Sequence, residues 1–483
     1  MNRPLRRVAI ACLVMFVALL LNANYLQLVQ AGDLNDRQGN SRVLLREYEH
    51  QRGPIVAGGT AVARSVATDD RLKYLRVYPG GPEYAPVTGF YSVVYGASAI
   101  ERAENSLLAG DDDRLFVRRL SDLVTGRTPK GGTVVLTINP KAQDAAWEGL
   151  RGKRGAVVAL DPRTGAILAM ASSPSYDPAK ISSHDSREAI DTYKRLSAEN
   201  DQPMLNRAIA QTYPPGSTFK VITSAAALSS GNYQPDTRIP APHQLSLPLT
   251  TRKLRNFGNE VCAGSGRMSL RDALRISCNT AFAALGMRLG PDALRRQAEA
   301  FGFDDAPTVP MQAAESHFPS EPDAPQTAQS AIGQFDVRVT PLQMAMVSAG
   351  IGNHGVVMKP YLVKEVRAPD LSVLDATSPD PLGRAIDAPV ADALTSMMVG
   401  VVQNGTGTSA RIGGTQVAGK TGTAQHGPGA APHAWFICFA PAENPVVAVE
   451  VVVEDGGDLN QEATGGRVAA PIAKAVMQAV LGR

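Results

Sequence analysis

The sequence predicts an α+β fold in which helices pack on an antiparallel sheet. A hairpin pattern occupies residues 155–172, a largely helical block covers 220–302 and 340–353, and strands return over 416–454 before a closing helix at 463–481. Strands gathered on either side of a helical block, without regular strand–helix alternation, are typical of the α+β class. A polar segment and a membrane anchor precede this domain.

The N-terminus has the pattern of a membrane segment. Three arginines lie within residues 1–7, and an apolar run begins at Val8 and continues, with two asparagines, to Leu28. A membrane span needs about 20 apolar residues, so this run can cross a bilayer. A cleaved signal peptide is the alternative, but the cleavage signal is weak. We expect an uncleaved anchor at 8–28 in the plasma membrane, a cytoplasmic tail at 1–7 and the remaining chain outside.

Length and composition limit the classes of function. The 483 residues are 44% apolar, which is enough for two or more domains with a large core. The formal charge is only +3 and aromatic residues make up 5% of the chain. Because nucleic-acid binders usually carry a dense basic surface and stacking aromatics, we expect no nucleic-acid partner.

Residues 33–128 are predicted to form a non-catalytic pedestal domain. They are polar with short extended runs at 42–45 and 73–78, and they contain no catalytic or metal-ligand spacing. A charged stretch at 111–114 and a glycine-containing stretch at 125–132 follow. The second domain is predicted to start at residue 130 and to end at 483.

The stretch from Tyr213 to Lys220 contains the first candidate for catalysis. Two prolines and a glycine before Ser217 are typical of a helix start, because proline presets the backbone angle there. Ser217 and Lys220 are three residues apart and can share a helix face. A lysine can supply the base that a serine nucleophile needs, and a helix N-terminus favours negative charge. An ordinary exposed serine and lysine would have the same spacing.

Ser277 and Asn279 lie at a polar break between helical patterns at 269–276 and 281–289. A hydroxyl and a carboxamide at such a break can relay protons and hold a substrate amide. An ordinary helix cap is the alternative.

A third motif, Lys420-Thr421-Gly422-Thr423, lies in the closing sheet. On a strand, Lys420 and Gly422 share one face and Thr421 lies on the other. Lysine and hydroxyl groups can bind a carboxylate, glycine permits close approach of a substrate backbone, and an edge amide can donate to an oxyanion.

The same segment also fits a phosphate-binding loop, since residues 414–421 match G-x-x-x-x-G-K-[ST]. Such a loop requires a buried strand before it and a helix after it. Residues 404–414 are instead rich in Gly, Thr and Ser, and 422–432 contain three glycines and two prolines. We therefore reject the nucleotide-binding interpretation.

The four cysteines have different predicted environments. Cys262 and Cys278 are 16 residues apart, and an extracytoplasmic location permits a disulfide between them, with two buried thiols as the alternative. A bridge would stabilise the fold by about 3 kcal/mol in the loop-entropy model. Cys438 is expected in a buried strand and Cys12 in the membrane.

The three motifs, in this order, resemble the motif set of penicillin-binding DD-transpeptidases. Residues 130–483 resemble the transpeptidase domain, including 155–162 and 331–334, and residues 52–55 and 84–101 resemble the family's N-terminal pedestal. The pedestal is too short for a glycan-polymerising domain, as in the monofunctional class B group. The resemblance implies a serine β-lactamase-like fold, with a helical subdomain beside an antiparallel sheet.

The resemblance also implies acyl transfer without a metal or cofactor. Ser217 would attack the carbonyl between the two terminal D-alanines of a peptidoglycan stem peptide and pass the acyl group to an amine of a neighbouring strand. Lys220 would be the base and must be neutral to act. Burial and the nearby cation Lys420 would both lower the pKa of Lys220.

The remaining motif residues take supporting roles by the same resemblance. Ser277 would carry a proton to the leaving amine, and Asn279 would orient Lys220 and the substrate amide. Thr421 and Thr423 would help Lys420 to hold the terminal carboxylate beside Gly422. The backbone amides of Ser217 and Thr423 would form the oxyanion hole.

Peptidoglycan stem peptides, β-lactams and a membrane glycan polymerase are the expected partners, with work at the division septum. A β-lactamase, a DD-carboxypeptidase and a catalytically silent β-lactam-binding scaffold are the alternatives. We find no Glu-x-x-x-Asn segment suited to deacylation between Asn279 and Lys420, and Glu315 lies in a Pro-rich region. His426 and His433 are interpreted as loop or rim residues.

Overall fold

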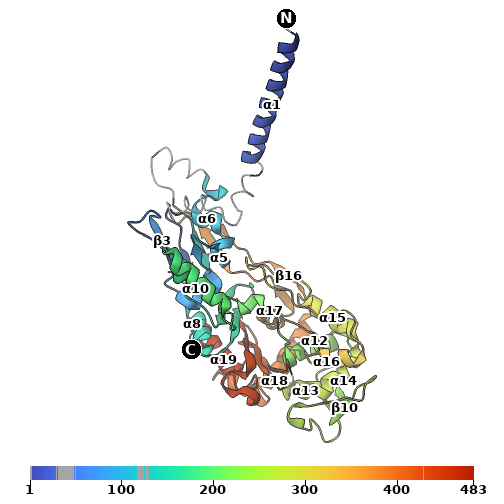
Figure 1. Ribbon diagram of the computed structural model, residues 1–483. Coiled ribbons are helices and arrows are strands. Elements are labelled where there is room, and N and C mark those ends of the chain that lie inside the picture. The colour runs from blue at the N-terminus through green and yellow to red at the C-terminus, as the bar shows by residue number, and fades with distance from the viewer. Residues whose placement is uncertain are drawn as a thin grey trace.

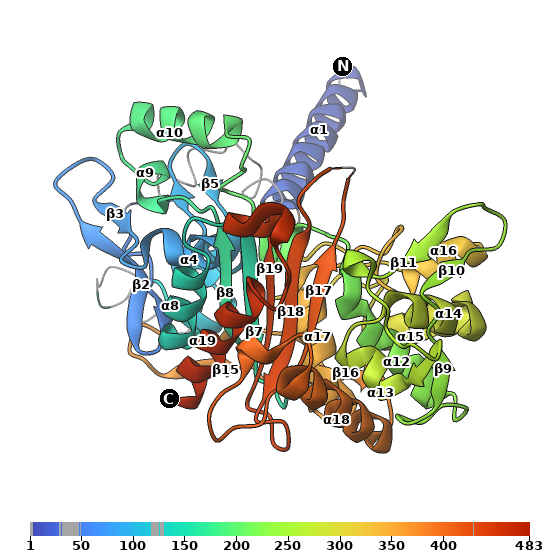
Figure 2. The same cartoon turned by 90° about the horizontal axis from the view of Figure 1, so that it is seen from below.

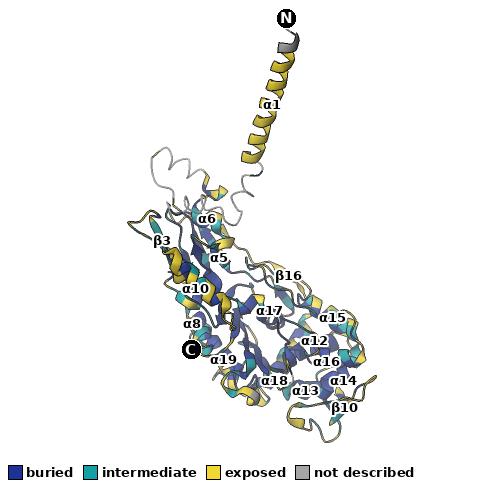
Figure 3. Ribbon diagram, viewed as in Figure 1, coloured by how far each residue is buried: buried dark blue, intermediate teal, exposed yellow. Residues whose placement is uncertain are grey.

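The computed structural model describes residues 3–28, 30, 48, 50–116, 125, 130–427 and 429–483, and Figure 1 shows a helix that leads into an elongated body. Helix α1 (Arg3–Leu28) contains one candidate membrane span, Arg6–Gln27, none of which is buried in protein (Figure 3). An apolar helix of this length without a protein partner is suited to lipid.

The pedestal is built on a six-stranded sheet of order β15-β14-β6-β1-β2-β3. Its strands are β1 (Ile55–Ala57), β2 (Thr60–Ala67), β3 (Tyr74–Val77), β6 (Thr133–Leu136), β14 (Val363–Arg367) and β15 (Val373–Ala376). The strand predicted within 73–78 is confirmed, whereas the run at 42–45 lies outside the described residues. Strands β6, β14 and β15 come after residue 130 in the sequence but belong to the pedestal sheet. The domain boundary at residue 130 therefore stays a prediction.

Short elements surround this sheet. They are α4 (Gly81–Thr88), β4 (Tyr91–Ser92), β5 (Gly96–Ala97), α5 (Ala99–Ala103), α6 (Asn105–Ala109), α9 (Pro178–Ile181) and α10 (Ser186–Ala198). Buried Glu101 binds the guanidinium groups of Arg52 and Arg76, both at 2.6 Å. Burial raises the pKa of Glu101, but Arg76 and Arg52 more than offset this and hold it below its ordinary value. The sequence did not indicate this buried charge cluster.

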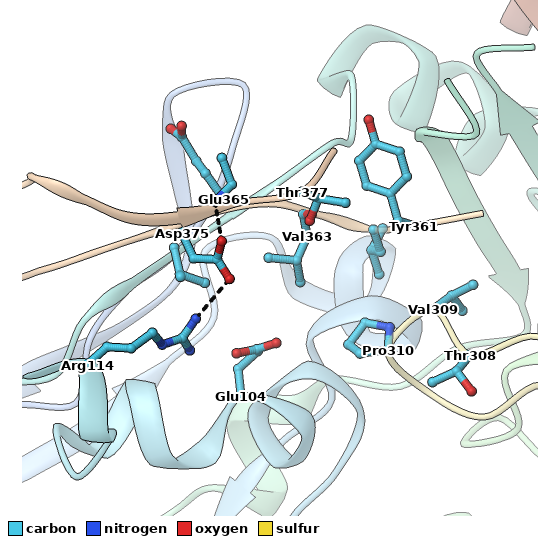
Figure 4. Close-up of a pocket in the computed structure, with 13 residues that line it drawn as sticks. Glu104, Arg114, Thr308, Val309, Pro310, Tyr361, Val363, Glu365, Asp375 and Thr377 are labelled. Carbon is cyan, nitrogen blue, oxygen red and sulfur yellow. Dashed lines mark hydrogen bonds and ion pairs between the residues drawn. The ribbon is translucent and has the colours of Figure 1, made fainter. Parts of the chain in front are cut away.

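A cavity of about 290 Å³ lies beside β14 and β15, between residues Glu104 and Arg114 and the segment 308–310 (Figure 4). Arg114, which faces it, forms an ion pair with Asp375 at 3.3 Å. Burial raises the pKa of Glu104 on the same wall. None of the predicted site residues lines this cavity.

The second sheet has five antiparallel strands in the order β17-β18-β19-β7-β8. Its strands are β7 (Gly155–Leu160), β8 (Ile167–Ser173), β17 (Ala418–Ala424), β18 (His433–Ala440) and β19 (Val447–Val453). Helices α8 (Pro140–Gly149) and α19 (Ala469–Leu481) cover one face, and α17 (Pro341–Gly352) covers the other (Figure 2). Because both faces are buried, β19 is apolar at almost every position.

Helices form a subdomain beside β17. They are α12 (Lys220–Ser229), α13 (Leu270–Arg275), α14 (Asn279–Leu289), α15 (Pro291–Ala300), α16 (Ala324–Ser330) and α18 (Ala388–Asn404), whereas α11 (Arg207–Ala210) packs against β7, β8 and α17. Small two-stranded sheets pair β9 (Arg238–Pro240) with β12 (Arg267–Ser269), β10 (Gln244–Ser246) with β11 (Lys253–Arg255), and β13 (Val356–Met358) with β16 (Pro381–Arg384). The α+β class and the hairpin at 155–172 are confirmed.

The closing helix begins at Ala469 rather than at the predicted Ala463. Gly465 lies against the sheet, where an added Cβ would be 2.0 Å from the carbonyl oxygen of Trp435 and 2.7 Å from that of Gly422. This close backbone contact delays the helix start until the chain has passed the sheet.

Candidate active site

Ser217 lies in a 3₁₀ turn, Gly216–Phe219, immediately before α12. Helix α12 therefore begins at Lys220, where the helical block was predicted to begin, and Ser217 lies in the short turn before it. In this turn Gly216 has a left-handed φ of 54° and its amide donates to Gly333 O at 2.9 Å. A Cβ at Gly216 would lie 2.9 Å from Thr423 O. Glycine thus allows the serine turn to lie against β17.

Two buried lysine amines converge on Ser277. Lys220 Nζ lies 2.7 Å from Ser277 O, 3.2 Å from Ser277 Oγ and 2.6 Å from Asn279 Oδ1. Lys420 Nζ lies 2.8 Å from Ser277 Oγ and 2.8 Å from Thr421 O. Both lysine residues are 0% exposed. The structure thus brings four predicted site residues from three segments into one hydrogen-bonded cluster.

The two lysines have lowered pKa values. Burial, and then the charge of Lys420, lowers the pKa of Lys220 well below its usual range. Burial lowers the pKa of Lys420 to about 7. A neutral Lys220 amine has two hydrogens and one lone pair, which match two acceptors, Ser277 O and Asn279 Oδ1, and one donor, the Ser277 hydroxyl. Lys220 is therefore equipped to accept a proton.

The predicted contacts of Lys220 are present only in part. The contact with Asn279 is present, whereas no hydrogen bond joins the side chains of Ser217 and Lys220 within the part of the chain that the structure describes. The serine lies one residue before the turn's Thr218, whose hydroxyl donates to Pro215 O at 2.8 Å. Direct pairing of Ser217 with Lys220 stays a prediction.

The break between α13 and α14 has an unusual backbone. Ser277 has a left-handed φ of 61°, which is rare for a residue with a Cβ. The structure joins Cys262 and Cys278 in a disulfide next to it. Asn256 Oδ1 accepts the amide of Thr280 at 3.0 Å and so stabilises the start of α14. Sequence reasoning missed Asn256, since nothing in the pattern placed it beside this helix.

Strand β17 carries the third motif. Thr421 and Thr423 lie on one side of the strand, and the Thr421 hydroxyl is 2.6 Å from that of Thr406. A Cβ at Gly422 would lie 3.0 Å from Pro215 O, so this glycine accommodates the serine turn. The sequence argument had assigned that close approach to a substrate backbone.

A carboxylate that the sequence analysis missed stabilises the serine turn. Glu454 Oε1 accepts from the Tyr213 hydroxyl at 2.7 Å and from Arg207 Nε at 2.8 Å, and Oε2 accepts from Arg154 at 2.5 Å. Because these partners are far apart in the sequence, no local sequence pattern predicted their contact with Glu454. Tyr213 precedes the serine turn, so the end of β19 is tied to the candidate nucleophile.

His426 lies in the loop after β17, as expected, whereas His433 is the buried first residue of β18 and is therefore not a loop or rim residue. Their rings stack with centroids 3.9 Å apart, and His426 Nε2 lies 3.1 Å from Asp455 Oδ1. The possible metal-ligand atoms of His426, His433 and Asp455 lie within 4.8 Å of one another, a spacing compatible with a bound cation. However, His433 Nδ1 accepts the Asp455 amide at 3.2 Å, so its lone pair is already used. Burial lowers the pKa of His433 to about 4.

Serine, two lysines and an asparagine arranged in this way on an α+β scaffold define an active-serine site of the penicillin-binding type. Residues 155–478 match the penicillin binding protein transpeptidase domain, and residues 52–134 match the penicillin binding protein A dimerisation domain. The chain belongs to the penicillin-binding protein transpeptidase family.

Particular relatives are similar over the full length. The chain is 49% identical over 490 residues to the peptidoglycan D,D-transpeptidase PbpA of Mycolicibacterium smegmatis, covering 100% of this chain and 99% of that one. The protein of the same name from Mycobacterium tuberculosis is 48% identical with the same coverage. The ceftriaxone acyl-enzyme structure of M. tuberculosis penicillin-binding protein A superposes with a TM-score of 0.88, covering 90% of this chain and 100% of that chain.

Proposed function

We propose that this protein is a peptidoglycan DD-transpeptidase that cross-links stem peptides through an acyl-serine intermediate. The observation that carries the proposal is the convergence of two buried lysine amines on Ser277 Oγ, at 3.2 Å and 2.8 Å, beside the Ser217 turn. The relatives named peptidoglycan D,D-transpeptidase support the reaction class.

Each residue has a role in this reaction. Ser217 Oγ attacks the carbonyl between the terminal D-alanines, and the neutral Lys220 amine receives its proton. Ser277, which contacts both lysines, passes a proton to the leaving D-alanine amine. A second amine then attacks the acyl-serine carbonyl and releases Ser217, so the peptide bond broken is replaced by the bond formed.

Substrate binding is assigned to β17 and the serine turn. Lys420, charged below a pKa of about 7, attracts the terminal carboxylate, with hydroxyl groups from Thr421 and Thr423. The amides of Ser217 and Thr423 donate to the developing oxyanion. These donors lie on a rigid strand and a turn stabilised by Glu454, which limits their reorganisation.

β-Lactams are proposed to acylate Ser217, as the acyl-enzyme structures of the M. tuberculosis relative support. Helix α1 is proposed to anchor the protein in the plasma membrane with the catalytic domain outside, since the arginines at its start favour the cytoplasmic side. We further propose that a membrane glycan polymerase supplies the glycan strands and that the protein cross-links them at the division septum.

The test uses fluorescent penicillin on the full-length protein in detergent micelles, with mass spectrometry of the labelled peptide. We expect a long-lived label on Ser217, and none on the Ser217→Ala variant. Rapid loss of the label would favour a β-lactamase, and lack of any label would favour the scaffold alternative. Release of D-alanine from a stem pentapeptide, with and without an acceptor amine, separates the transpeptidase from a carboxypeptidase.

A further inference from the structure

The hairpin of β10 and β11 carries positive charge without acidic partners. Arg252, Lys253 and Arg255 are exposed and none forms an ion pair within the described chain. Residues 236–275 contain seven basic and three acidic side chains, a formal excess of +4, whereas the whole chain carries +3. The positive charge of the protein is therefore concentrated around this hairpin.

Apolar side chains are exposed beside these charges. Leu249 is 86% exposed, Phe257 55% and Val261 57%. Large apolar side chains exposed within one short segment, next to cations, are typical of a surface that binds another molecule. The hairpin lies at the end of the body opposite to the pedestal sheet (Figure 1).

The base of the hairpin is attached directly to the candidate active site. Asn256, the residue after β11, accepts the Thr280 amide at 3.0 Å. Cys262 is joined to Cys278, whose neighbour Ser277 contacts both catalytic lysines. A molecule held by the hairpin would therefore lie next to the Ser277 segment.

We propose that the β10–β11 hairpin is a docking surface for the carboxylate-bearing stem peptides of a peptidoglycan strand that extends from the active site. The inference rests on the proposed function and adds a substrate contact outside the three motifs. Three free cations match peptide carboxylates, and the exposed Leu249, Phe257 and Val261 match the methyl groups of alanine residues. A purely ionic polymer would use the cations but not this apolar surface.

The experiment measures sedimentation of the full-length protein, in detergent micelles, with purified insoluble peptidoglycan sacculi at low ionic strength. The test variant is R252E/K253E/R255E. The matched control, R187E/K194E/R195E, reverses three exposed basic residues on α10. We expect the hairpin variant to lose about tenfold in affinity and the control to change by less than about twofold, because complementary charges act locally.

Sacculi whose carboxylates have been converted to methylamides identify the ligand group. We expect wild-type affinity for these sacculi to fall by about the same factor as the hairpin reversal causes. Equal binding of native and blocked sacculi, or equal losses in the hairpin and control variants, would overturn the proposal. Hairpin-dependent binding to soluble polyphosphate without hairpin-dependent binding to sacculi would also overturn it, in favour of a phosphorylated polymer.

Fluorescent penicillin labelling keeps this proposal separate from the proposed function. Both variants should label Ser217 at rates within about twofold of wild type, because they leave the motif residues and the disulfide unchanged. Absence of labelling in wild type would reject the proposed function. Normal labelling together with unchanged sacculus binding by R252E/K253E/R255E would reject the docking surface alone. Thermal midpoints equal to wild type establish that the variants are folded.

Discussion

Lys420→Met tests whether the second buried lysine binds the substrate carboxylate. The wild-type amine is 0% exposed, lies 2.8 Å from Ser277 Oγ and 2.8 Å from Thr421 O, and has a pKa of about 7. Methionine has a similar unbranched shape without the charge. Because the buried amine is costly to desolvate, we expect the variant to fold with an unchanged or higher thermal midpoint.

The magnitude follows from the hydrogen bond that is lost. A hydrogen bond to a charged group contributes about 1.5–3 kcal/mol, which corresponds to about a 10- to 100-fold change in rate or affinity. Wild type should therefore acylate faster with a free-acid penicillin than with its methyl ester. In Lys420→Met this preference should fall by that factor. Loss of the Ser277 contact should slow both compounds, so the ratio of the two rates isolates the carboxylate.

The assay is stopped-flow acylation of the full-length protein by the two penicillins between pH 5.5 and 8.5. The amine is charged below its pKa, so the wild-type preference for the free acid should decline as the pH rises through about 7. The variant should show no such decline. An equal slowing of acid and ester by Lys420→Met, at every pH, would refute the assignment of Lys420 to the carboxylate.

Three further predictions concern other residues. Asn279→Ala should slow acylation about 10- to 100-fold, since the buried Lys220 amine loses an acceptor at 2.6 Å. The control Asn232→Ala changes an exposed asparagine and should leave the acylation rate unchanged. Equal acylation rates in the two variants would contradict the orienting role of Asn279. Mild reduction of the Cys262–Cys278 disulfide should slow acylation, and unchanged rates after verified reduction would exclude coupling. Glu450 is wholly buried without a hydrogen-bond partner in the described chain and burial raises its pKa, so Glu450→Gln should raise the thermal midpoint at pH 7.5. A carboxyl group whose pKa is raised in the folded state destabilises that state once the pH exceeds the pKa of the unfolded chain, so the gain in thermal midpoint should shrink as the pH falls toward about 4. A gain that does not depend on pH would contradict this explanation.

The sequence predicted those features that depend on local pattern. Two apolar runs on either side of a turn gave the hairpin at 155–172, and apolar sequence within 416–454 gave the strands that include β19. The resemblance of the three motifs to those of penicillin-binding proteins implied the cluster of Lys220, Ser277, Asn279 and Lys420. The lowered pKa of Lys220 was also anticipated, because burial and a nearby cation act in the same direction.

Contacts between distant segments that carry no recognisable motif could not be predicted. Glu454 joins Arg154, Arg207 and Tyr213 only after β19 and the serine turn have come together. Parallel pairing of β6 with β1 is likewise a property of the tertiary fold. Long-range pairings of this kind leave no periodic signal in either partner.

The conformation of Ser277 explains why the surrounding contacts are needed. A left-handed φ of 61° costs a residue with a Cβ about 1 kcal/mol or more, yet it allows both the carbonyl and the hydroxyl of one residue to meet the Lys220 amine, at 2.7 Å and 3.2 Å. The Cys262–Cys278 disulfide and the contact of Asn256 with Thr280 fix the following residues. The segment that follows the hairpin, which contains Asn256 and Cys262, thus stabilises the residues beside the strained serine and links the proposed docking surface to the active site.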